Sequence, residues 1–430
     1  MVRVTHHKQL AGIVLLAALT LLLFMRGIVP GTSRIDTDFP NYLTAARIVA
    51  DGGQVERLYD NSWFQEQMRR YGIGKPSEGK FAPFPPPTAL LMVPLARLEP
   101  LNALRIMTGV SIVCLVCSII LLMRILSWSF VDTAVFTLLS GYALLNSLRF
   151  GQPYVLVSAS CILGYYLYGQ GKPLLAGICF GLFTPLKYFP IVILIYFAFR
   201  REWKVVLGGA IAILAVATTS IGILGWKVHA EFLSAVLGNH LLGNLSMQDP
   251  FATSFQSFDA LFRQLFIFDA TSNPQPLIAV PALQGIGVLI TKASILLATL
   301  ATLVKLARRD SATATAPSIG ILGILVLLLA PATATYHFVL LWLPVGLLIG
   351  YFLRERTPVC AYIILALYAL IGFFPYRMTA PFEGRGALAV LAFPRLLLLL
   401  TMFVVSVYFI WHSTAPAHEG RAHDSPTVLE

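Results

Sequence analysis

The sequence predicts an all-α polytopic membrane protein, with a single integral membrane domain over residues 1–412. Three observations lead to this prediction. Of the 430 residues, 57% are hydrophobic, only 12% are charged, and long apolar runs recur along the whole chain. Soluble proteins carry about 25% charged residues. A run of about 18 or more apolar residues is long enough to cross a bilayer as a helix.

The apolar runs predict about twelve membrane-spanning helices. We expect them at 10–28, 86–98, 101–123, 130–148, 152–168, 172–199, 203–225, 284–304, 317–333, 338–353, 358–374 and 388–411. The first run lacks a small-residue cleavage site and is followed by further spans, so it is expected to be a retained helix rather than a signal peptide. The second run is short and begins in a triple proline, and proline suits a first helical turn.

Clusters of basic residues predict the orientation. With twelve spans the clusters all fall on one side, which is then cytoplasmic: Arg3, Lys8, Arg200, Arg201, Lys204, Lys305, Arg308, Arg309, Arg354 and Arg356. Both ends of the chain are then inside, including a tail at 413–430 that is expected to be disordered. The long loops 29–85 and 226–283 are then both outside.

The net charge of +11 does not indicate nucleic-acid binding, because the basic residues lie in short loops beside apolar runs and form no basic domain. All five cysteines lie inside apolar runs, where small buried hydrophobes are expected rather than a metal site. The sequence lacks the glycine patterns of P-loop and Rossmann nucleotide sites, the H-E-x-x-H zinc pattern and the G-x-S-x-G elbow. These absences argue against a nucleotide-powered pump, a metalloprotease and a serine hydrolase.

The two outer loops carry most of the acidic residues. Seven of the 20 Asp and Glu residues lie in loop 29–85, four lie in loop 226–283, and none lies in the middle of a predicted span. In the first loop "PNYLTAARIVADGG" predicts a helix that stops at two glycines. "NSWFQEQMRRYG" predicts a helix lying in the membrane interface. A folded outer loop on a membrane bundle suggests chemistry at the outer surface.

Asp38 is the first candidate for that chemistry. A carboxylate just above the bilayer, near apolar walls, can have a raised pKa and act as a general base. The alternative is helix capping, because Asp38 precedes Phe39-Pro40 and acids favour helix N-termini. In extended backbone Asp36 and Asp38 point to the same side, so they either share a site or Asp36 is a solvated neighbour.

Three further positions have a functional and a structural interpretation. Lys187 is a single charge in a long apolar run and lies between two prolines. It either binds an anionic headgroup such as phosphate, or its side chain snorkels to the membrane surface. His337 lies in an external turn. It either contacts a phosphate or an acceptor hydroxyl, or it has no functional role. Arg263 pairs with a phosphate or lies on a solvated face. Tyr336 favours an aromatic-belt role, and "GQP" at 151–153 favours a tight cytoplasmic turn.

Taken in order, these pieces resemble glycosyltransferase family 87. The matching segments are Asp38-Phe39-Pro40-x-Tyr42 with "AARIVADGG" and "LYD", then "FAPFPPPTALLMVPLARL", "GQPYVL", "LAGICFGLFTPLKYFP" with "RREW", "SFQSFDALFRQL" and "PATATYH". The resemblance covers about 35–350. The sequence departs from the family's usual pattern at Phe84, Phe255, Ala334 and Tyr336. These departures bear on the sugar and the acceptor more than on the reaction.

The resemblance implies a C-type glycosyltransferase (GT-C) bundle that moves a sugar from a polyprenyl-phosphate donor to a lipid or glycan acceptor at the outer face of the cell membrane. Mannose is the first expectation and arabinofuranose the second. The family's catalytic base maps to Asp38, and its mid-chain lysine and late histidine map to Lys187 and His337. Asp36, Tyr42, Gln256 and Tyr336 are further candidates for the substrate site.

The chemistry implied by the resemblance is compatible with these residues. The leaving group is a lipid monophosphate, so cations such as Lys187 with Arg263 or His337 are expected, and no metal or cofactor. A single base without a protein nucleophile implies inversion at the sugar carbon, by analogy with glycoside hydrolysis. The alternatives are a secondary transporter or lipid flippase, or a membrane scaffold. Carriers usually need acids or broken helices near the midplane, and the absence of mid-span acids favours the enzyme.

Overall fold

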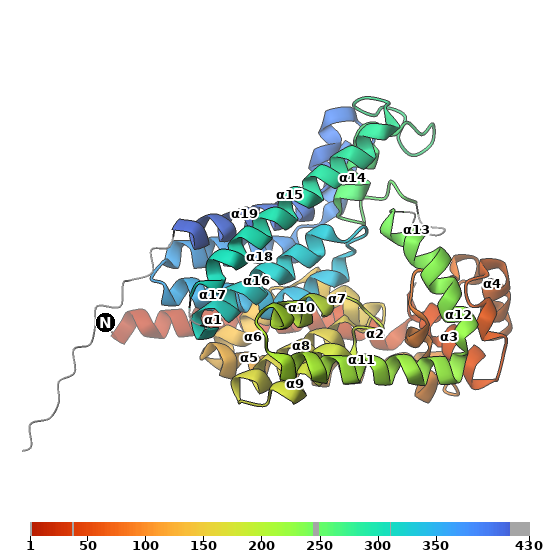
Figure 1. Ribbon diagram of the computed structural model, residues 1–430, viewed down its shortest axis with the longest axis horizontal. Coiled ribbons are helices and arrows are strands. Elements are labelled where there is room, and N and C mark those ends of the chain that lie inside the picture. Colours follow the sequence, from red (N-terminus) through yellow and green to blue (C-terminus); the bar gives the residue numbers. More distant parts are fainter. Residues whose placement is uncertain (1, 37, 244–248, 310, 413–430) are drawn as a thin grey trace, which may run out of the picture.

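A computed structural model describes residues 2–36, 38–243, 249–309 and 311–412 of the chain. The tail 413–430 lies outside the described residues. Within those ranges the regular elements are helices, joined by turns and two isolated β-bridges. The helices form a bundle with a folded cap at one end (Figure 1). The predicted all-α class is therefore confirmed.

Six helical segments of the described chain are long and apolar enough to cross a membrane. The first is Gln9–Ser33, which comprises α1 (Val2–Leu23) from Gln9 on, η1 (Phe24–Ile28) and α2 (Val29–Ser33). The others are α5 (Pro100–Leu126), α11 (Trp203–Leu224), α15 (Pro281–Ala307), α19 (Pro394–His412) and Thr335–Arg354, in which η7 (Thr335–Leu341) joins α17 (Trp342–Arg354). The chain is therefore a multi-pass membrane protein.

A seventh candidate span is broken. α6 (Phe130–Leu138) and α7 (Tyr142–Arg149) meet at an angle of 72°. Gly141 at the break has φ of +52°, and a Cβ built there would lie 2.5 Å from the carbonyl oxygen of Gly372. Both the left-handed backbone and the close approach require glycine here. The expected twelve spans are thus not confirmed, because further apolar segments are shorter than 18 residues. They include α8 (Tyr154–Gly169), α18 (Pro358–Phe373) and Thr313–Leu329 within α16 (Ser311–Leu329).

Two of the expected spans are not spans. The run 86–98 forms two short 3-10 turns, η4 (Pro86–Leu90) and η5 (Val93–Leu95). The run 172–199 is a hairpin of α9 (Pro173–Leu182) and α10 (Ile191–Phe199). The beginning and the end of this hairpin lie close together. The hydroxyl of Tyr168, which precedes the hairpin, donates to Oε1 of Glu202, which follows it, at 3.1 Å. Its tip reaches the cap through Lys187.

These two differences compensate each other in the topology. Without a span at 86–98, α5 crosses in the opposite direction to the one expected. Because 172–199 is a hairpin that returns to the same side, α11 again crosses in the expected direction. Both long loops therefore still lie at one end, as expected: the core of the cap includes Leu224 and Val228 at the start of the second loop. The turn at 151–153, however, lies at the cap end and not at the opposite end, since the side chain of Gln152 contacts Asp38.

The cap has its own hydrophobic core. α3 (Phe39–Ala50) stops just before Gly52, whose φ is +65°, as the sequence predicted. α4 (Asn61–Arg70) is capped by Asp60. Its buried face, Phe64 and Met68, packs into the core of the cap. The apolar side of α4 is thus explained by packing within the cap. Smaller turns complete the cap: η2 (Val55–Arg57) and η3 (Pro76–Glu78).

The second loop continues past the cap as α12 (Trp226–Glu231), η6 (Phe232–Val236) and α13 (Leu237–Leu241), and then forms α14 (Phe258–Phe266). A third peripheral segment, η8 (Tyr376–Phe382) and η9 (Gly386–Ala392), was not expected, because its apolar sequence was assigned in part to the last span. It joins the second loop through a hydrogen bond of 2.7 Å from the Gly386 nitrogen to the Gln275 carbonyl.

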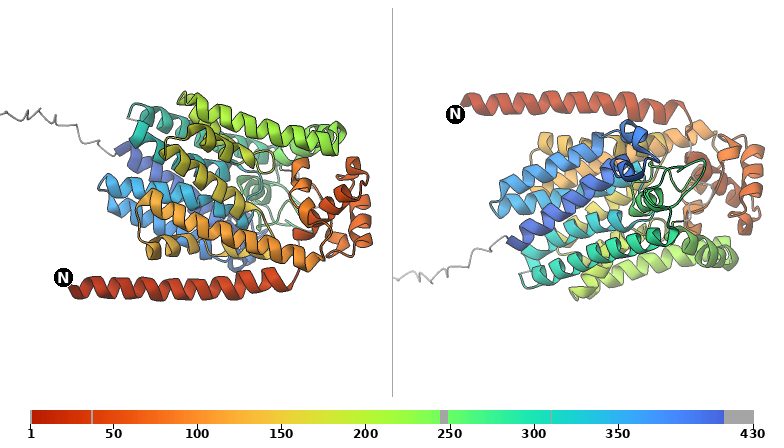
Figure 2. Two further views of the ribbon diagram at one scale, coloured as in Figure 1. Left: turned by 90° about the horizontal axis from the view of Figure 1, so that it is seen from below. Right: turned by 90° about the horizontal axis from the view of Figure 1, so that it is seen from above.

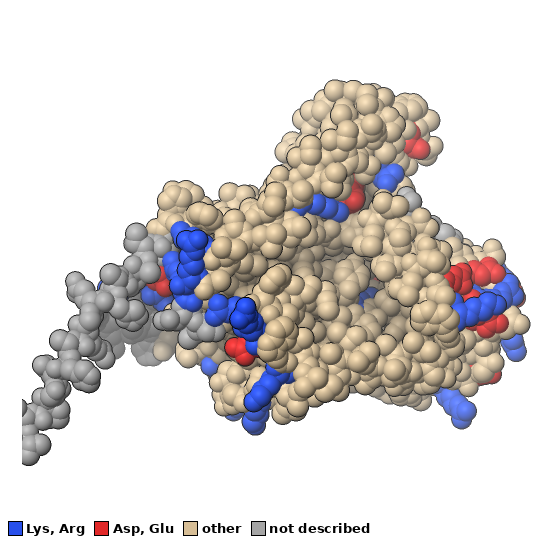
Figure 3. All heavy atoms as spheres, viewed as in Figure 1, with Lys and Arg blue, Asp and Glu red and all other residues tan. Residues whose placement is uncertain are grey.

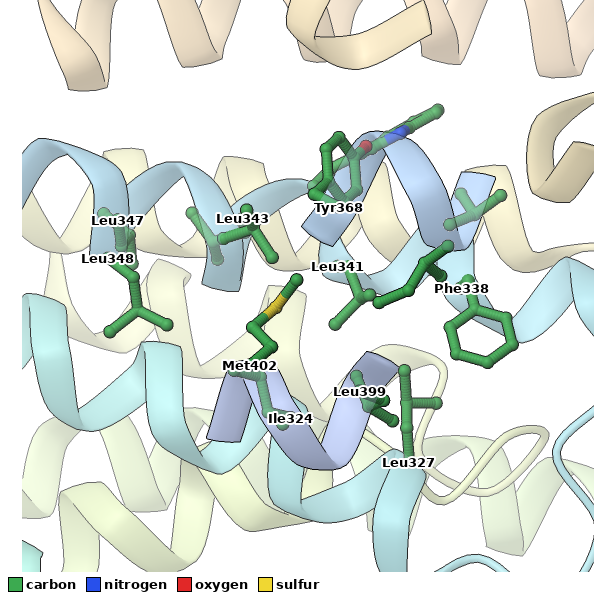
Figure 4. Close-up of a cluster of buried hydrophobic side chains, with 14 of the residues drawn as sticks. Ile324, Leu327, Phe338, Leu341, Leu343, Leu347, Leu348, Tyr368, Leu399 and Met402 are labelled. Atoms are coloured by element: carbon green, nitrogen blue, oxygen red, sulfur yellow. The ribbon is translucent and has the colours of Figure 1, made fainter. Parts of the chain in front are cut away.

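The surface separates into charged ends and an apolar middle. Figure 3 shows Lys and Arg gathered at the end away from the cap, mixed charges over the cap, and few charges in the broad band between. α1 runs along one side of the bundle, with many exposed apolar side chains (Figure 2). Below the cap, a core cluster is drawn from α16, η7, α17, α18 and α19 (Figure 4). An apolar outer belt around such a core is typical of a bundle solvated by lipid.

Candidate functional site

Asp38 lies immediately before α3 and is half-buried at the base of the cap. Its side chain makes no capping hydrogen bond to α3. Instead, Oδ2 accepts a hydrogen bond from Gln152 Nε2 at 2.8 Å, and the Tyr336 hydroxyl also hydrogen-bonds to the carboxylate. Desolvation raises the pKa of Asp38, and the hydrogen bond from Gln152 and the charges of Lys187 and Lys80 oppose that effect.

The partners of Asp38 form a chain. The Tyr42 hydroxyl donates to Gln152 Oε1 at 2.8 Å, and Lys187 Nζ donates to the Tyr42 oxygen at 3.3 Å. Gln152 and Tyr42 are both fully buried. Gln152 is held by the turn that ends α7, where Gly151 has φ of +60° and the Gln152 nitrogen donates to the Ser147 carbonyl at 2.8 Å. The expected tight turn is present, and it also aims the amide at Asp38.

Lys187 lies where the hairpin turns between α9 and α10 and is 7% exposed. Its Nζ is 4.5 Å from the ring centroid of Phe84, 5.1 Å from that of Tyr154 and 5.6 Å from that of Tyr42. Aromatic faces stabilise a cation by their quadrupoles. Lys187 therefore points into the protein towards Asp38 and does not snorkel.

One cavity, which we call the lysine cavity, lies beside this chain. It is small, about 80 Å³. Its lining includes four groups that can carry positive charge and a set of aromatic walls: Lys80, Lys187, His240 and His337, with Phe84, Tyr154, Tyr188, Phe189, Phe255 and Tyr336. Burial lowers the pKa of His240 to about 4, with a smaller effect from Lys187, so His240 is neutral at pH 7. The lysines therefore dominate the charge of this cavity.

A second cavity, which we call the arginine cavity, lies on the other side of Asp38. It is larger, about 580 Å³, within the usual range for small-molecule sites. It is lined by polar, charged and aromatic side chains: Asp36, Tyr142, Asn146, Arg149, Phe150, Ser254, Phe255, Thr335, Tyr336, Arg377 and Arg395, together with Asp38 itself. Asp38, Phe255, Ala334 and Tyr336 line both cavities. Asp38 is thus the carboxylate at their junction.

A family model for glycosyltransferase family 87 matches residues 81–331, more than half of the 430-residue chain. The chain belongs to glycosyltransferase family 87. It is therefore a membrane glycosyltransferase, and the transporter and scaffold alternatives do not account for this membership. No curated protein and no solved structure gave a significant match to the chain. The family 87 match begins inside the cap, just after Lys80, and ends at the start of the late turn, so it includes Gln152 and Lys187.

In this family 87 protein most of the site residues expected from the sequence lie together. Asp38, Lys187, His337 and Tyr336 line the lysine cavity, and Asp36 lines the arginine cavity. Asp36 forms ion pairs with Arg149 and with Arg34. Tyr42 lies behind the cavity wall and contacts Lys187 and Gln152. His337 Nδ1 accepts a hydrogen bond of 3.2 Å from the Ala334 nitrogen, so in the neutral ring the proton is on Nε2.

Besides Tyr42, two expected site residues, Gln256 and Arg263, line neither cavity. The Gln256 amide binds only backbone: its Nε2 donates to the carbonyls of Thr253 and Ala392, and its Oε1 accepts from the nitrogens of Arg395 and Leu396. Both N–H groups of Nε2 and both lone pairs of Oε1 are used, so Gln256 has a structural role in joining these backbone segments. Arg263 lies over the ring of Phe251 and near Asp259, which is bound to Lys292. It is separate from the lysine cavity.

Sequence reasoning missed several residues of the site. Gln152 was interpreted only as part of a turn, and Lys80 was not assigned to the site. His240, Arg149 and Arg377 were not considered. The available signal was weak: Lys80 stands just before the proline-rich segment that leads to Phe84, and "GQP" interrupts two apolar runs. Each of these residues reaches the site through contacts that are distant in sequence.

Proposed function

We propose that this enzyme transfers a sugar from a polyprenyl-phosphate donor to a lipid or glycan acceptor, with Asp38 as general base and inversion at the sugar carbon. Mannose is the sugar that the family resemblance favours, with arabinofuranose second. The observation that carries the proposal is the position of Asp38, whose carboxylate is shared by a lysine-lined cavity and a larger polar one.

The lysine cavity suits the sugar donor. A lipid monophosphate needs positive charge around its oxygens, and Lys187 and Lys80 supply it within a partly enclosed space. His337 Nε2–H is a further donor for a phosphate oxygen. Charge placed in advance where the leaving phosphate develops its own charge lowers the barrier, since little reorganisation is needed during the reaction.

The arginine cavity suits the acceptor. It is wide enough for a sugar or a headgroup, and its arginines, asparagine and aromatic rings match the hydroxyl groups and faces of a glycan. In the reaction, the acceptor oxygen attacks the anomeric carbon and its proton passes to Asp38. The bond from that carbon to the phosphate oxygen breaks, and the polyprenyl phosphate leaves with the electron pair beside Lys187.

The charge pattern supports an active site on the outer side of the cell membrane. The end opposite the cap carries Arg124, Lys172, Arg200, Arg201, Lys204, Lys305, Arg308, Arg309, Arg354 and Arg356, with few described acids. A basic end is typical of the cytoplasmic side. The cap and both cavities then lie outside, where lipid-linked sugars are used without nucleotide donors.

Reconstitution tests the proposal. Proteoliposomes of the full chain are given polyprenyl-phosphate-[³H]mannose, or the arabinofuranose donor, with membrane lipids and glycolipids as acceptors. We expect labelled product whose new linkage has the opposite anomeric configuration to the donor. Retention of configuration would exclude the single-base mechanism. If neither sugar is transferred while a nucleotide sugar is used, the proposed donor class is wrong.

A further inference from the structure

Two buried side chains link Lys187 to Asp38 without touching the open space of either cavity. Tyr42 and Gln152 are both fully buried and line neither cavity, yet each uses its polar atoms within this chain. Polar groups buried in such a chain restrict the geometry of the groups at its ends.

The chain of hydrogen bonds from Lys187 to Asp38 has a definite direction. Lys187 can only donate, so the Tyr42 oxygen accepts from it and the Tyr42 hydroxyl hydrogen goes to Gln152 Oε1. The amide oxygen is thereby turned towards Tyr42, and Nε2 is turned towards Asp38 Oδ2, at 2.8 Å. The other rotation of the amide would set two acceptors, Oε1 and the carboxylate, against each other. Lys187 therefore determines that Asp38 contacts the Nε2 group of the amide and not its oxygen.

We infer that Gln152 and Tyr42 are positioning residues that hold Asp38 in its basic, correctly oriented form and couple it to the cation of the donor site. The inference rests on the proposed role of Asp38 as general base. Gln152 donates to Oδ2 and Tyr336 also donates to the carboxylate, so the acceptor proton goes to a lone pair that these two side chains leave open. A donor phosphate that binds Lys187 then contacts the first member of the hydrogen-bond chain that orients Asp38.

The inference has a signature in the pH dependence. A base works only when it is deprotonated, so activity is lost as the pH falls through the pKa of Asp38. The hydrogen bond from Gln152 lowers that pKa, and its removal therefore moves the acid limb of the profile to higher pH. The other titratable and charged groups that face Asp38 from the surrounding elements stay unchanged: Asp36, Lys80, Arg149, Tyr154, Lys187, His240, Tyr336, His337, Arg377 and Arg395.

The test compares pH–rate profiles of the full chain in proteoliposomes for the wild type, Gln152→Leu, Gln152→Glu and Tyr42→Phe. We expect Gln152→Leu to lower kcat by about tenfold or more, and to shift the acid limb upward while the KM for the donor changes little. Gln152→Glu keeps the shape of the side chain but sets a second carboxylate against Asp38, so its upward shift is larger. Tyr42→Phe frees the amide to rotate and gives a smaller shift in the same direction.

Tyr59→Phe is the matched control, because the Tyr59 hydroxyl donates to the Phe84 carbonyl at 2.7 Å in the same cap but does not belong to the chain. It is expected to keep the wild-type profile. If the Gln152 variants lose activity with an unmoved acid limb, the role of Gln152 is only structural and the inference fails. If Asp38→Asn transfers sugar at the wild-type rate, the proposed base itself is wrong, which is a separate result.

Discussion

The lysine cavity and the arginine cavity share Asp38 but differ in almost every other respect. The lysine cavity is small, and its lysines stand at the tip of a hairpin and in a loop of the cap. The arginine cavity is several times larger and is lined from α7, η7 and the peripheral segments near η8 and α19. A narrow charged site suits a constant group such as phosphate. A wide site with polar, charged and aromatic walls suits a larger group with many hydroxyls, such as a glycan.

The proposed mechanism gives the two cavities different roles. In it, the charge of the lysine cavity holds the leaving group, and the arginine cavity recognises hydroxyl groups. A general base is then needed only where the two cavities meet, at Asp38. Four predictions test this division, beginning with the carboxylate that both cavities share and ending with a residue that lines neither cavity.

Asp38→Asn is expected to have the largest effect. It keeps the size of the side chain but removes the base, and we expect kcat to fall by about 100-fold or more, as is usual for loss of a general base. The transfer assay in proteoliposomes measures this. Asp36→Asn is the control: Asp36 lines only the arginine cavity and pairs with Arg149 and Arg34, so a milder loss is expected. Equal losses would mean that the two acids act as one site.

Lys187→Met is expected to rank second. Methionine preserves much of the stem but removes the charge beside the leaving phosphate. Hydrogen bonds to charged groups contribute about 1.5–3 kcal/mol, so kcat/KM for the donor is expected to fall by about 10- to 100-fold. Lys80→Met, in the same cavity but half-buried and in a loop, is expected to have a smaller effect of the same kind. An increase in the acceptor KM instead would exchange the assignments of the two cavities.

Arg377→Ala is expected to act only on the acceptor. Arg377 is exposed and lines the arginine cavity alone. A polar contact of this kind at an exposed position contributes about 1 kcal/mol, so we expect the acceptor KM to rise about threefold to tenfold with the donor KM unchanged. Arg385→Ala is the matched control, since Arg385 is exposed on the same peripheral segment and lines neither cavity. If both variants behave alike, the cavity wall has no special part in acceptor binding.

How far the sequence predicted this site depends on the range of each contact. α3 and its stop were predicted because proline, glycine and the apolar pattern act within a few residues. Asp38 and Lys187 stood out because a charge beside or inside an apolar run is costly. The contact between Asp38 and Gln152 joins residues 114 positions apart. Nothing local in "GQP" distinguishes an amide that orients a base from one that closes a turn.

The spans were harder to predict for a related reason. Hydropathy measures how apolar a segment is but not in which direction the chain leaves it. The 172–199 run is long enough to cross a bilayer, yet it folds back at the segment that holds Lys187 between Pro185 and Pro190. The glycines that let α9 pack closely on α11 gave no directional signal either: a Cβ built on Gly177 would lie 1.9 Å from the Val205 carbonyl oxygen.

Arg263→Ala is expected to have the smallest effect, and it tests whether the two cavities account for the site. The sequence suggested Arg263 as a phosphate ligand, but the arginine lies against Phe251 and Asp259, outside both cavities. Burial lowers the pKa of Arg263, and the nearby charge of Asp259 opposes that effect. Because Arg263 lines neither cavity, we expect kcat/KM for the donor to stay within about twofold of the wild type, with at most a modest loss of thermal stability. A donor-specific loss as large as that of Lys187→Met would mean that the phosphate is held by α14 as well, and that the lysine cavity is only one part of a longer donor site.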